Sequence, residues 1–145
     1  MNVLGVEYPG YSIYEGKPNE QKIYDDLEGI LVFVQKSLMI ELSKVILVGR
    51  SLGTGPVIEL ATRCRVGCMV LISPFSSIKE VVKNMVGSFG QLFIKQRFDN
   101  LSKAPRVKCP TLILHGEKDA LVPAEHAKKI YGEFCFSSRF PLLFH

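Results

Sequence analysis

The most restrictive feature of this chain is an apolar run that ends in closely spaced glycines around a serine. Residues 45–48 are apolar throughout, and Gly49, Ser51 and Gly53 follow directly. A run without polar alternation predicts a strand buried on both faces, as in a parallel sheet. The residues from Leu52 to about Arg63 predict a helix, so the glycines must form a tight strand-to-helix turn.

The turn sequence, residues 49–53, fits the pattern G-x-S-x-G. In such a turn the serine adopts a strained backbone conformation and projects its hydroxyl above the sheet. Side chains two positions before or after it would collide with neighbouring elements, which explains Gly49 and Gly53. We therefore expect Ser51 to be a nucleophile and the backbone N–H of Leu52, at the helix start, to stabilise an oxyanion.

Two other interpretations of the glycine-rich turn remain open. It could cradle a phosphate, or it could only allow close packing. The sequence lacks the Lys-Ser/Thr of a P-loop and does not match G-x-G-x-x-G, so the nucleophile turn is the favoured interpretation.

The rest of the chain alternates between strand-like and helical segments. This order predicts an α/β fold with a parallel sheet, right-handed crossovers and helices on both faces. The length of 145 residues, without a repeat or linker, predicts a single domain over residues 1–145. The expected strands are residues 3–8, 45–48, 69–72 and 111–114, and the expected helices are residues 19–34, 52–63, 77–97 and 123–134.

Composition excludes several classes of function. The net charge of +4 is spread along the chain, so nucleic-acid binding is not expected. Cys64 and Cys68 have no second cluster at a ligand spacing, which argues against a metal site and favours reduced thiols in a cytoplasmic protein. No signal peptide or membrane span is recognisable, and no cofactor motif is present.

A serine nucleophile requires a base and an acid that orients the base. Asp119 lies on the loop after the strand at residues 111–114, where the acid is expected. A structural aspartate in a local turn is the plainer interpretation, and Glu117 and Asp99 are weaker alternatives for the acid.

Four segments of the chain together resemble the α/β-hydrolase superfamily, closest to its ABHD17 and Bem46-like serine hydrolases among the serine aminopeptidase-like members. The resemblance runs from about residue 2 to residue 131 and covers most of the chain. The segments are VEYPGYSIYEG, GRSLGTGP, LISPFSSIKE and CPTLILHGEKDALVP.

This resemblance implies a serine hydrolase with Ser51 as nucleophile and Asp119 as acid. It implies cleavage of an ester or thioester through an acyl-enzyme, without a cofactor. In the nearest subgroup the substrates are palmitoylated membrane-associated proteins, which implies such a partner and peripheral contact with a membrane. It also places the loop of residues 8–11 beside the active site, although Ser12 replaces a usual glycine.

The chain departs from the family pattern in two places. The resemblance implies that the strands before residue 3, and the loop that supplies a second oxyanion donor, are missing, so an incomplete domain is expected. The family's histidine follows one more strand in a Gly-His pattern, and His145 stands 26 positions after Asp119 (145 − 119) without that glycine. His115 is expected to order its own loop and His126 to be a packing residue.

Two further alternatives stay open. The basic and apolar residues 78–98 form either a cap over an acyl pocket or an ordinary helix packed on the sheet. The chain is either an ester or thioester hydrolase, a serine peptidase of the same fold, or a fragment without catalytic activity.

Overall fold

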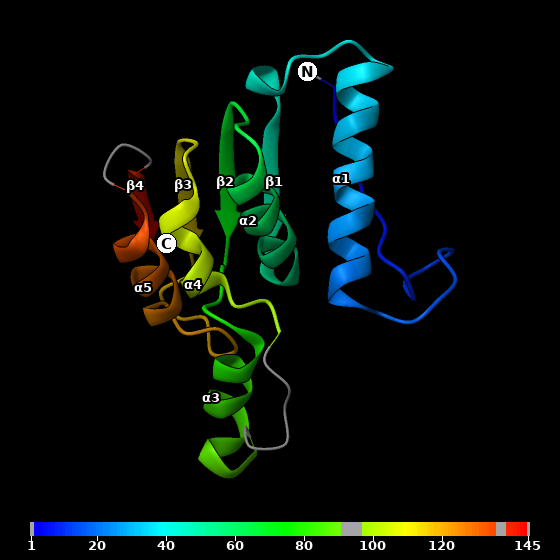
Figure 1. The fold of residues 1–145 in the computed structure, drawn as a ribbon. Helices are drawn as coiled ribbons and strands as arrows, with labels where there is room; N and C mark the ends of the chain where they lie inside the picture. Colours follow the sequence, from blue (N-terminus) through cyan, green and yellow to red (C-terminus); the bar gives the residue numbers. More distant parts are fainter. Residues whose placement is uncertain (1, 91–96, 136–138, 145) are drawn as a thin grey trace.

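A parallel four-stranded sheet with the order β1-β2-β3-β4 organises the structure, a computed structural model that describes residues 2–90, 97–135 and 139–144 (Figure 1). The predicted α/β class with a parallel sheet is confirmed. The strands are β1 Ile46–Arg50, β2 Cys68–Ile72, β3 Thr111–His115 and β4 Arg139–Phe144. The helices are α1 Glu20–Lys36, η1 Leu42–Lys44, η2 Ser51–Gly53, α2 Thr54–Arg63, α3 Ile78–Gly90, α4 Asn100–Lys103, η4 Ala104–Arg106 and α5 Glu125–Glu133.

The sequence accounts directly for where α1 begins and which side it buries. The side chain of Asn19 accepts a hydrogen bond from the Lys22 N–H at 3.0 Å and so caps the helix. Apolar residues at intervals of three and four then form one buried stripe. The helix predicted from this pattern is confirmed, and its buried residues are Ile23, Tyr24, Leu27, Leu31 and Val34.

β1 is buried on one face only, so the expectation of a strand buried on both faces is wrong. Leu47 is 8% exposed, whereas Ile46 and Val48 are 50% and 60% exposed. The helices that contact the sheet, α2 and α5, lie in front of it in Figure 1. Helices were expected on both faces of the sheet. In the described part of the chain, they cover one face only.

Residues 3–8 do not form the predicted strand. They run as an extended segment without strand pairing and line a groove on α1 that includes Ile30 and Phe33. A strand needs a neighbour to satisfy its N–H and C=O groups. The segment lies against α1 and not beside β1, so its apolar character does not produce a strand.

β4 corresponds to the extra strand that the family resemblance implied after Asp119. It pairs in parallel with β3 from Thr111↔Arg139 to His115↔Phe144, with a register shift between Thr111 and Ile113. Its carboxyl end therefore lies at the same edge of the sheet as the ends of the other strands.

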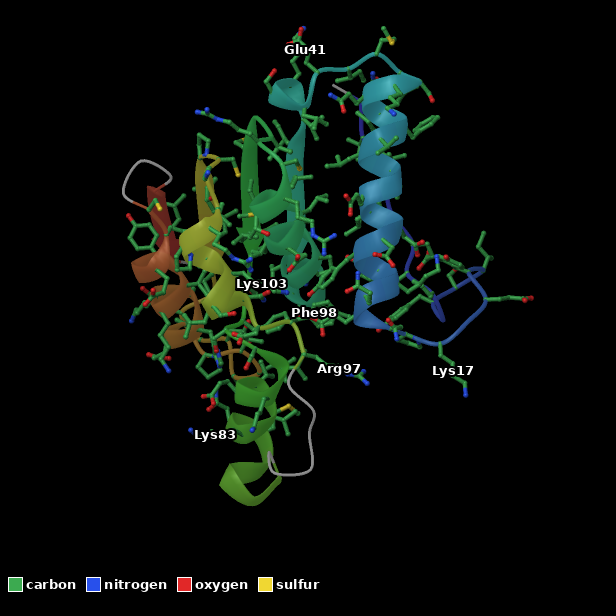
Figure 2. All side chains as sticks on the ribbon, in the orientation of Figure 1. Lys17, Glu41, Lys83, Arg97, Phe98 and Lys103 are labelled. Carbon is green, nitrogen blue, oxygen red and sulfur yellow. The ribbon has the colours of Figure 1, made fainter. Side chains whose placement is uncertain are left out.

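A charged network fixes α1 against α2 and α4 in the middle of the molecule (Figure 2). The Lys103 ammonium lies 2.8 Å from a Glu59 carboxylate oxygen and donates to the Tyr24 hydroxyl at 2.7 Å. Glu59 also accepts from Arg63 at 2.9 Å. Burial would raise the pKa of Glu59, but the hydrogen bonds from Lys103 and Arg63 lower it, so the carboxylate stays ionised.

The chain leaves the sheet after β2, forms α3 and returns at Asn100. Two backbone hydrogen bonds close this excursion: Ile78 N–H to the Arg97 carbonyl at 3.1 Å, and Asn100 N–H to the Ser76 carbonyl at 2.8 Å. The Asn100 amide also donates to the Phe75 carbonyl at 2.8 Å. The helix predicted over residues 77–97 is thus confirmed from Ile78 to Gly90, and the part over residues 91–96 lies outside the described residues.

None of the helices in the described ranges combines the length and the apolar character that a membrane crossing requires.

Candidate active site

Ser51 lies at the carboxyl end of β1, in the conformation that the G-x-S-x-G pattern predicts. Its φ angle is +48°, which is a left-handed conformation that costs a non-glycine residue about 1–2 kcal/mol. The residue is exposed and starts the 3-10 turn η2, which continues into α2. The serine is therefore presented to solvent by a strained turn between a strand and a helix.

Of the two glycines that flank the serine, Gly49 is required by close packing. A Cβ atom there would lie 2.6 Å from the Gly53 carbonyl oxygen and 2.6 Å from Val57 Cγ2. The expectation that a side chain at Gly53 would also collide with a neighbouring element is wrong. A Cβ atom there would meet nothing closer than the Tyr8 hydroxyl at 3.5 Å. The reason is that Gly53 makes its close approach with its carbonyl group, which faces Gly49.

Leu52 is the second residue of η2, so its backbone N–H belongs to the first turn of a helix. The N–H groups of a first turn have no acceptor within the helix and are free to bind an anion. The placement of Leu52 is that required of an oxyanion donor next to Ser51, and its role stays a prediction.

Ser73 occupies the position on β2 that matches Ser51 on β1. Arg50 pairs with Ile72 in the parallel register, so the two serines are the next residues along adjacent strands. Ser73 has a φ of +49°, and its side chain contributes to lowering the pKa of the Asp119 carboxyl group. In the sequence, a Ser-Pro step at a strand end is a weak indication of this residue.

Asp119 lies in the loop after β3, and its carboxylate orders that loop. One oxygen accepts the N–H of Val122 at 2.9 Å and the N–H of Leu121 at 3.0 Å. These bonds, together with the Ser73 side chain and the charge of His115, lower the pKa of Asp119, so it is ionised at neutral pH. The turn interpretation and the interpretation as an acid are therefore compatible.

The alternative acids are placed less favourably. Asp99 caps α4 by accepting the Ser102 N–H at 3.3 Å, and Glu117 is exposed. Among the described residues, neither carboxylate forms a hydrogen bond with Ser51 or Ser73.

His115 orders the loop, as predicted. It is 3% exposed, and its Nε2 lies 2.7 Å from the Val122 carbonyl oxygen, to which it donates. Its Nδ1 is buried without a partner among the described residues. A ring held in this way inside the loop is not available to take a proton from Ser51.

His126 is a buried packing residue, also as predicted. The Ser76 N–H donates to Nδ1 at 3.2 Å, and the Ser76 hydroxyl lies 2.8 Å from the same atom. This places the ring hydrogen on Nε2, 2.8 Å from the Asn84 amide, which must then present its oxygen. His126 thus connects α5 to Ser76, two residues before α3, and to Asn84 within α3.

The remaining histidine candidate, His145, lies outside the described residues. The last described strand, β4, ends at Phe144, at the carboxyl edge of the sheet.

The loop of residues 8–11 reaches the serine turn. A Cβ atom at Gly53 would have the Tyr8 hydroxyl as its nearest neighbour, at 3.5 Å. The Tyr8 ring packs edge-on against the Tyr11 ring, with ring centroids 6.2 Å apart. Burial raises the pKa of Tyr8, so its hydroxyl is protonated at neutral pH. This places Tyr8 beside the turn that carries Ser51, as the family resemblance implied.

The four cysteines are free thiols, and the described residues contain no group of three or more potential ligands that could hold a metal ion. Burial raises the pKa of the Cys64 and Cys109 thiols. Both therefore behave as packing residues and not as reactive thiolates.

The sequence model of the serine hydrolase (FSH1) family matches residues 14–145, which include Ser51 and Asp119. The chain belongs to this family. The match confirms the resemblance to α/β-hydrolases that the sequence motifs indicated, and it covers β1, β2, β3 and the loop that carries Asp119.

Individual relatives agree with this assignment. The chain is 35% identical to the α/β-hydrolase domain-containing protein aho-3 of Caenorhabditis elegans, over 97% of this chain and 41% of the relative. It is 28% identical to the human α/β-hydrolase domain-containing protein 17B, over 90% of this chain and 44% of the relative. The chain thus spans less than half the length of these relatives.

A solved structure shares the fold. It is an α/β serine hydrolase homologue from Coxiella burnetii, with a TM-score of 0.66 and 20% sequence identity over 94% of this chain and 54% of the other. This similarity supports the parallel sheet and the helix arrangement of the chain described above.

Proposed function

We propose that this chain contributes the nucleophile and the acid of a serine hydrolase that cleaves an ester or thioester. The observation that carries the proposal is the left-handed conformation of exposed Ser51 on a strand-to-helix turn of a serine hydrolase family member. Such strain persists where the surrounding packing imposes it, here at Gly49, and it commonly marks a functional residue.

In the proposed reaction, the Ser51 Oγ attacks the acyl carbonyl carbon and its proton passes to a base. The negative charge that develops on the carbonyl oxygen is stabilised by the Leu52 N–H. The bond to the alcohol or thiol then breaks, the leaving group takes the proton, and an acyl-serine remains. Water hydrolyses this ester and restores Ser51. The role of ionised Asp119 is to orient the base.

Neither described histidine suits the base, because His115 and His126 are buried and bonded elsewhere. His145 is the remaining histidine of the sequence and is the proposed candidate. A thioester of a palmitoylated protein, met at a membrane surface, is the finer substrate proposal, and it rests on the family resemblance.

The first experiment is labelling of the 145-residue chain with a fluorophosphonate, which reacts with activated serines. Circular dichroism of the same samples confirms folding. We expect labelling of the wild type and none of Ser51→Ala, with loss of labelling in His145→Gln and retention in His126→Gln. A folded wild type that stays unlabelled would contradict the proposal and favour the inactive fragment.

The substrate class is tested separately. The hydrolysis rates of a palmitoyl thioester and of an aminoacyl amide are compared at the same substrate concentrations. Faster Ser51-dependent turnover of the thioester is expected, and preference for the amide would instead support a peptidase.

A further inference from the structure

We propose that a cleft beside α3 binds the phosphate group of a phosphomonoester. The cleft has a volume of about 600 Å³ and lies where the start of α3, the start of α4 and α5 meet. Ser51 and Asp119 do not line it, so the proposal is independent of the hydrolase proposal. The lining residues include Ser76, Ser77, Lys79, Lys83, Asp99 and Lys129.

Among the described residues, two ammonium groups at the cleft have no counterion within ion-pair distance. Lys83 lies 3.8 Å from Glu80, so these two charges offset one another. Lys79 of α3 and Lys129 of α5 have no carboxylate within ion-pair distance among the described residues. The lining holds three lysines and two carboxylates, a net charge of +1 (3 − 2).

The helix end at the cleft adds to this positive character. α3 has 13 residues, and the Ser77 hydroxyl already accepts the Glu80 N–H at 3.2 Å. The N–H of Lys79 belongs to the same first turn, where backbone donors lack acceptors within the helix and the dipole favours an anion. An anion in the cleft would therefore meet the Lys79 backbone N–H as well as two ammonium groups.

The pKa of the neighbouring His126 depends on the charges at the cleft. Burial lowers its pKa, and the charge of Lys129 lowers it further, together with His115, while Glu80 and Glu125 act in the opposite direction. Ser76, whose hydroxyl lies 2.8 Å from His126 Nδ1, lines the cleft. His126 is thus a natural reporter, because an anion beside Lys129 would raise its pKa.

The charge of the lining favours a phosphate monoester over a carboxylate. A monoester carries a charge of about −1.5 to −2 at neutral pH and three strong acceptor oxygens. It can therefore neutralise Lys79 and Lys129 together, from two different helices. A single carboxylate can neutralise only one of them. The phosphate can belong to a soluble metabolite or to the headgroup of an anionic lipid.

The experiment is a titration of the isotope-labelled 145-residue chain with glycerol 3-phosphate, observed by NMR at constant ionic strength. We expect saturable shifts of the Ser76, Ser77 and Lys79 amides and a rise in the His126 pKa. Lys79→Gln and Lys129→Gln should each weaken binding roughly fivefold. Lys128→Gln, on the same helix but outside the cleft lining, is the matched control and should bind as the wild type does.

Further arms identify the source of the phosphate. Glycerate tests a carboxylate of similar size, and phosphatidylcholine vesicles with and without phosphatidic acid test a lipid headgroup. Binding to Ser51→Ala should be unchanged, which separates this site from the hydrolase proposal. Absence of saturable shifts, equal binding of glycerate, or an equal loss in Lys128→Gln would each overturn the proposal.

Discussion

Ser51 and Ser73 are the next residues after the paired positions Arg50 and Ile72 of adjacent strands, and both have left-handed backbones, with φ angles of +48° and +49°. The Ser73 side chain contributes to lowering the pKa of Asp119. Strand β2 therefore connects the serine turn on β1, through Ser73, with the acidic loop after β3.

We therefore predict that the Ser73 hydroxyl helps to keep the pKa of Asp119 low. Ser73→Ala and Ser73→Gly both remove the hydroxyl and should raise the pKa of Asp119 toward its ordinary value. Carbon-detected NMR titration of the carboxyl group measures this change. Because glycine accepts a positive φ, Ser73→Gly should be more stable than Ser73→Ala by about 1 kcal/mol. An unchanged pKa of Asp119 in both variants would refute the link.

The two glycines of the turn should differ in their tolerance of alanine. Gly49→Ala places a methyl group 2.6 Å from the Gly53 carbonyl oxygen, and we expect a loss of about 3 kcal/mol in unfolding free energy. Gly53→Ala meets no close atom, and Gly53 has a φ of −63°, so it should cost nothing or stabilise by about 0.5 kcal/mol. Urea denaturation of the two variants makes the comparison, and equal losses would contradict it.

The Lys103 network predicts a specific loss of stability. Lys103→Met leaves the mostly buried Glu59 carboxylate without its 2.8 Å partner and should cost about 2 kcal/mol. Lys44→Met is the control, because Lys44 lies 3.9 Å from Glu41 and both side chains are about 70% exposed. That control should change stability by less than about 0.5 kcal/mol. Similar effects of both substitutions in chemical denaturation would show that the network adds little.

Stability should fall as the pH drops below 6.5, because His126 is held neutral. The unfolded chain takes up a proton near the ordinary value of 6.5, whereas folded His126 does so only at a lower pH. Unfolding free energy therefore decreases through this window by up to about 1.4 kcal/mol per pH unit. His126→Gln should flatten this part of the pH profile, and a slope unchanged by the substitution would point to another group.

Asp119 affects a more acidic window in the same direction. Its pKa is lowered in the folded state, so its contribution is complete above the ordinary value of 3.8 and is lost as the pH falls through the folded pKa. In denaturation at varied pH, His126→Gln should therefore depart from the wild type below about pH 6.5, and Asp119→Asn should depart only below about pH 3.8.

The sequence predicted those features that depend on local pattern. The helices at α1 and α2, the strands β1 to β3, and the strained conformation of Ser51 follow from apolar spacing and from the glycines of the turn. Residues 3–8 have the composition of a strand but lack a neighbouring strand, and composition carries no information on neighbours. For the same reason, the apolar run of β1 did not reveal that Ile46 and Val48 are exposed.

The candidate site was predictable to a similar extent. Ser51 and Asp119 stand in recognisable motifs, whereas the contact of Ser73 with Asp119 joins residues 46 positions apart (119 − 73) and has no local signature. The difference between Gly49 and Gly53 was also hidden, because it depends on whether a carbonyl group or a Cα atom makes the close approach.

The closure of the α3 excursion has a consequence for how such a protein can diverge. The chain departs at Ser76 and returns at Asn100, and hydrogen bonds to the carbonyls of Phe75 and Ser76 fix the point of return. Because these bonds hold the two ends of the excursion together, we expect insertions between them to leave the strands and the Asp119 loop in register. Mutations in this excursion can therefore change the groups near the carboxyl ends of the strands, while the sheet that supports those ends stays the same.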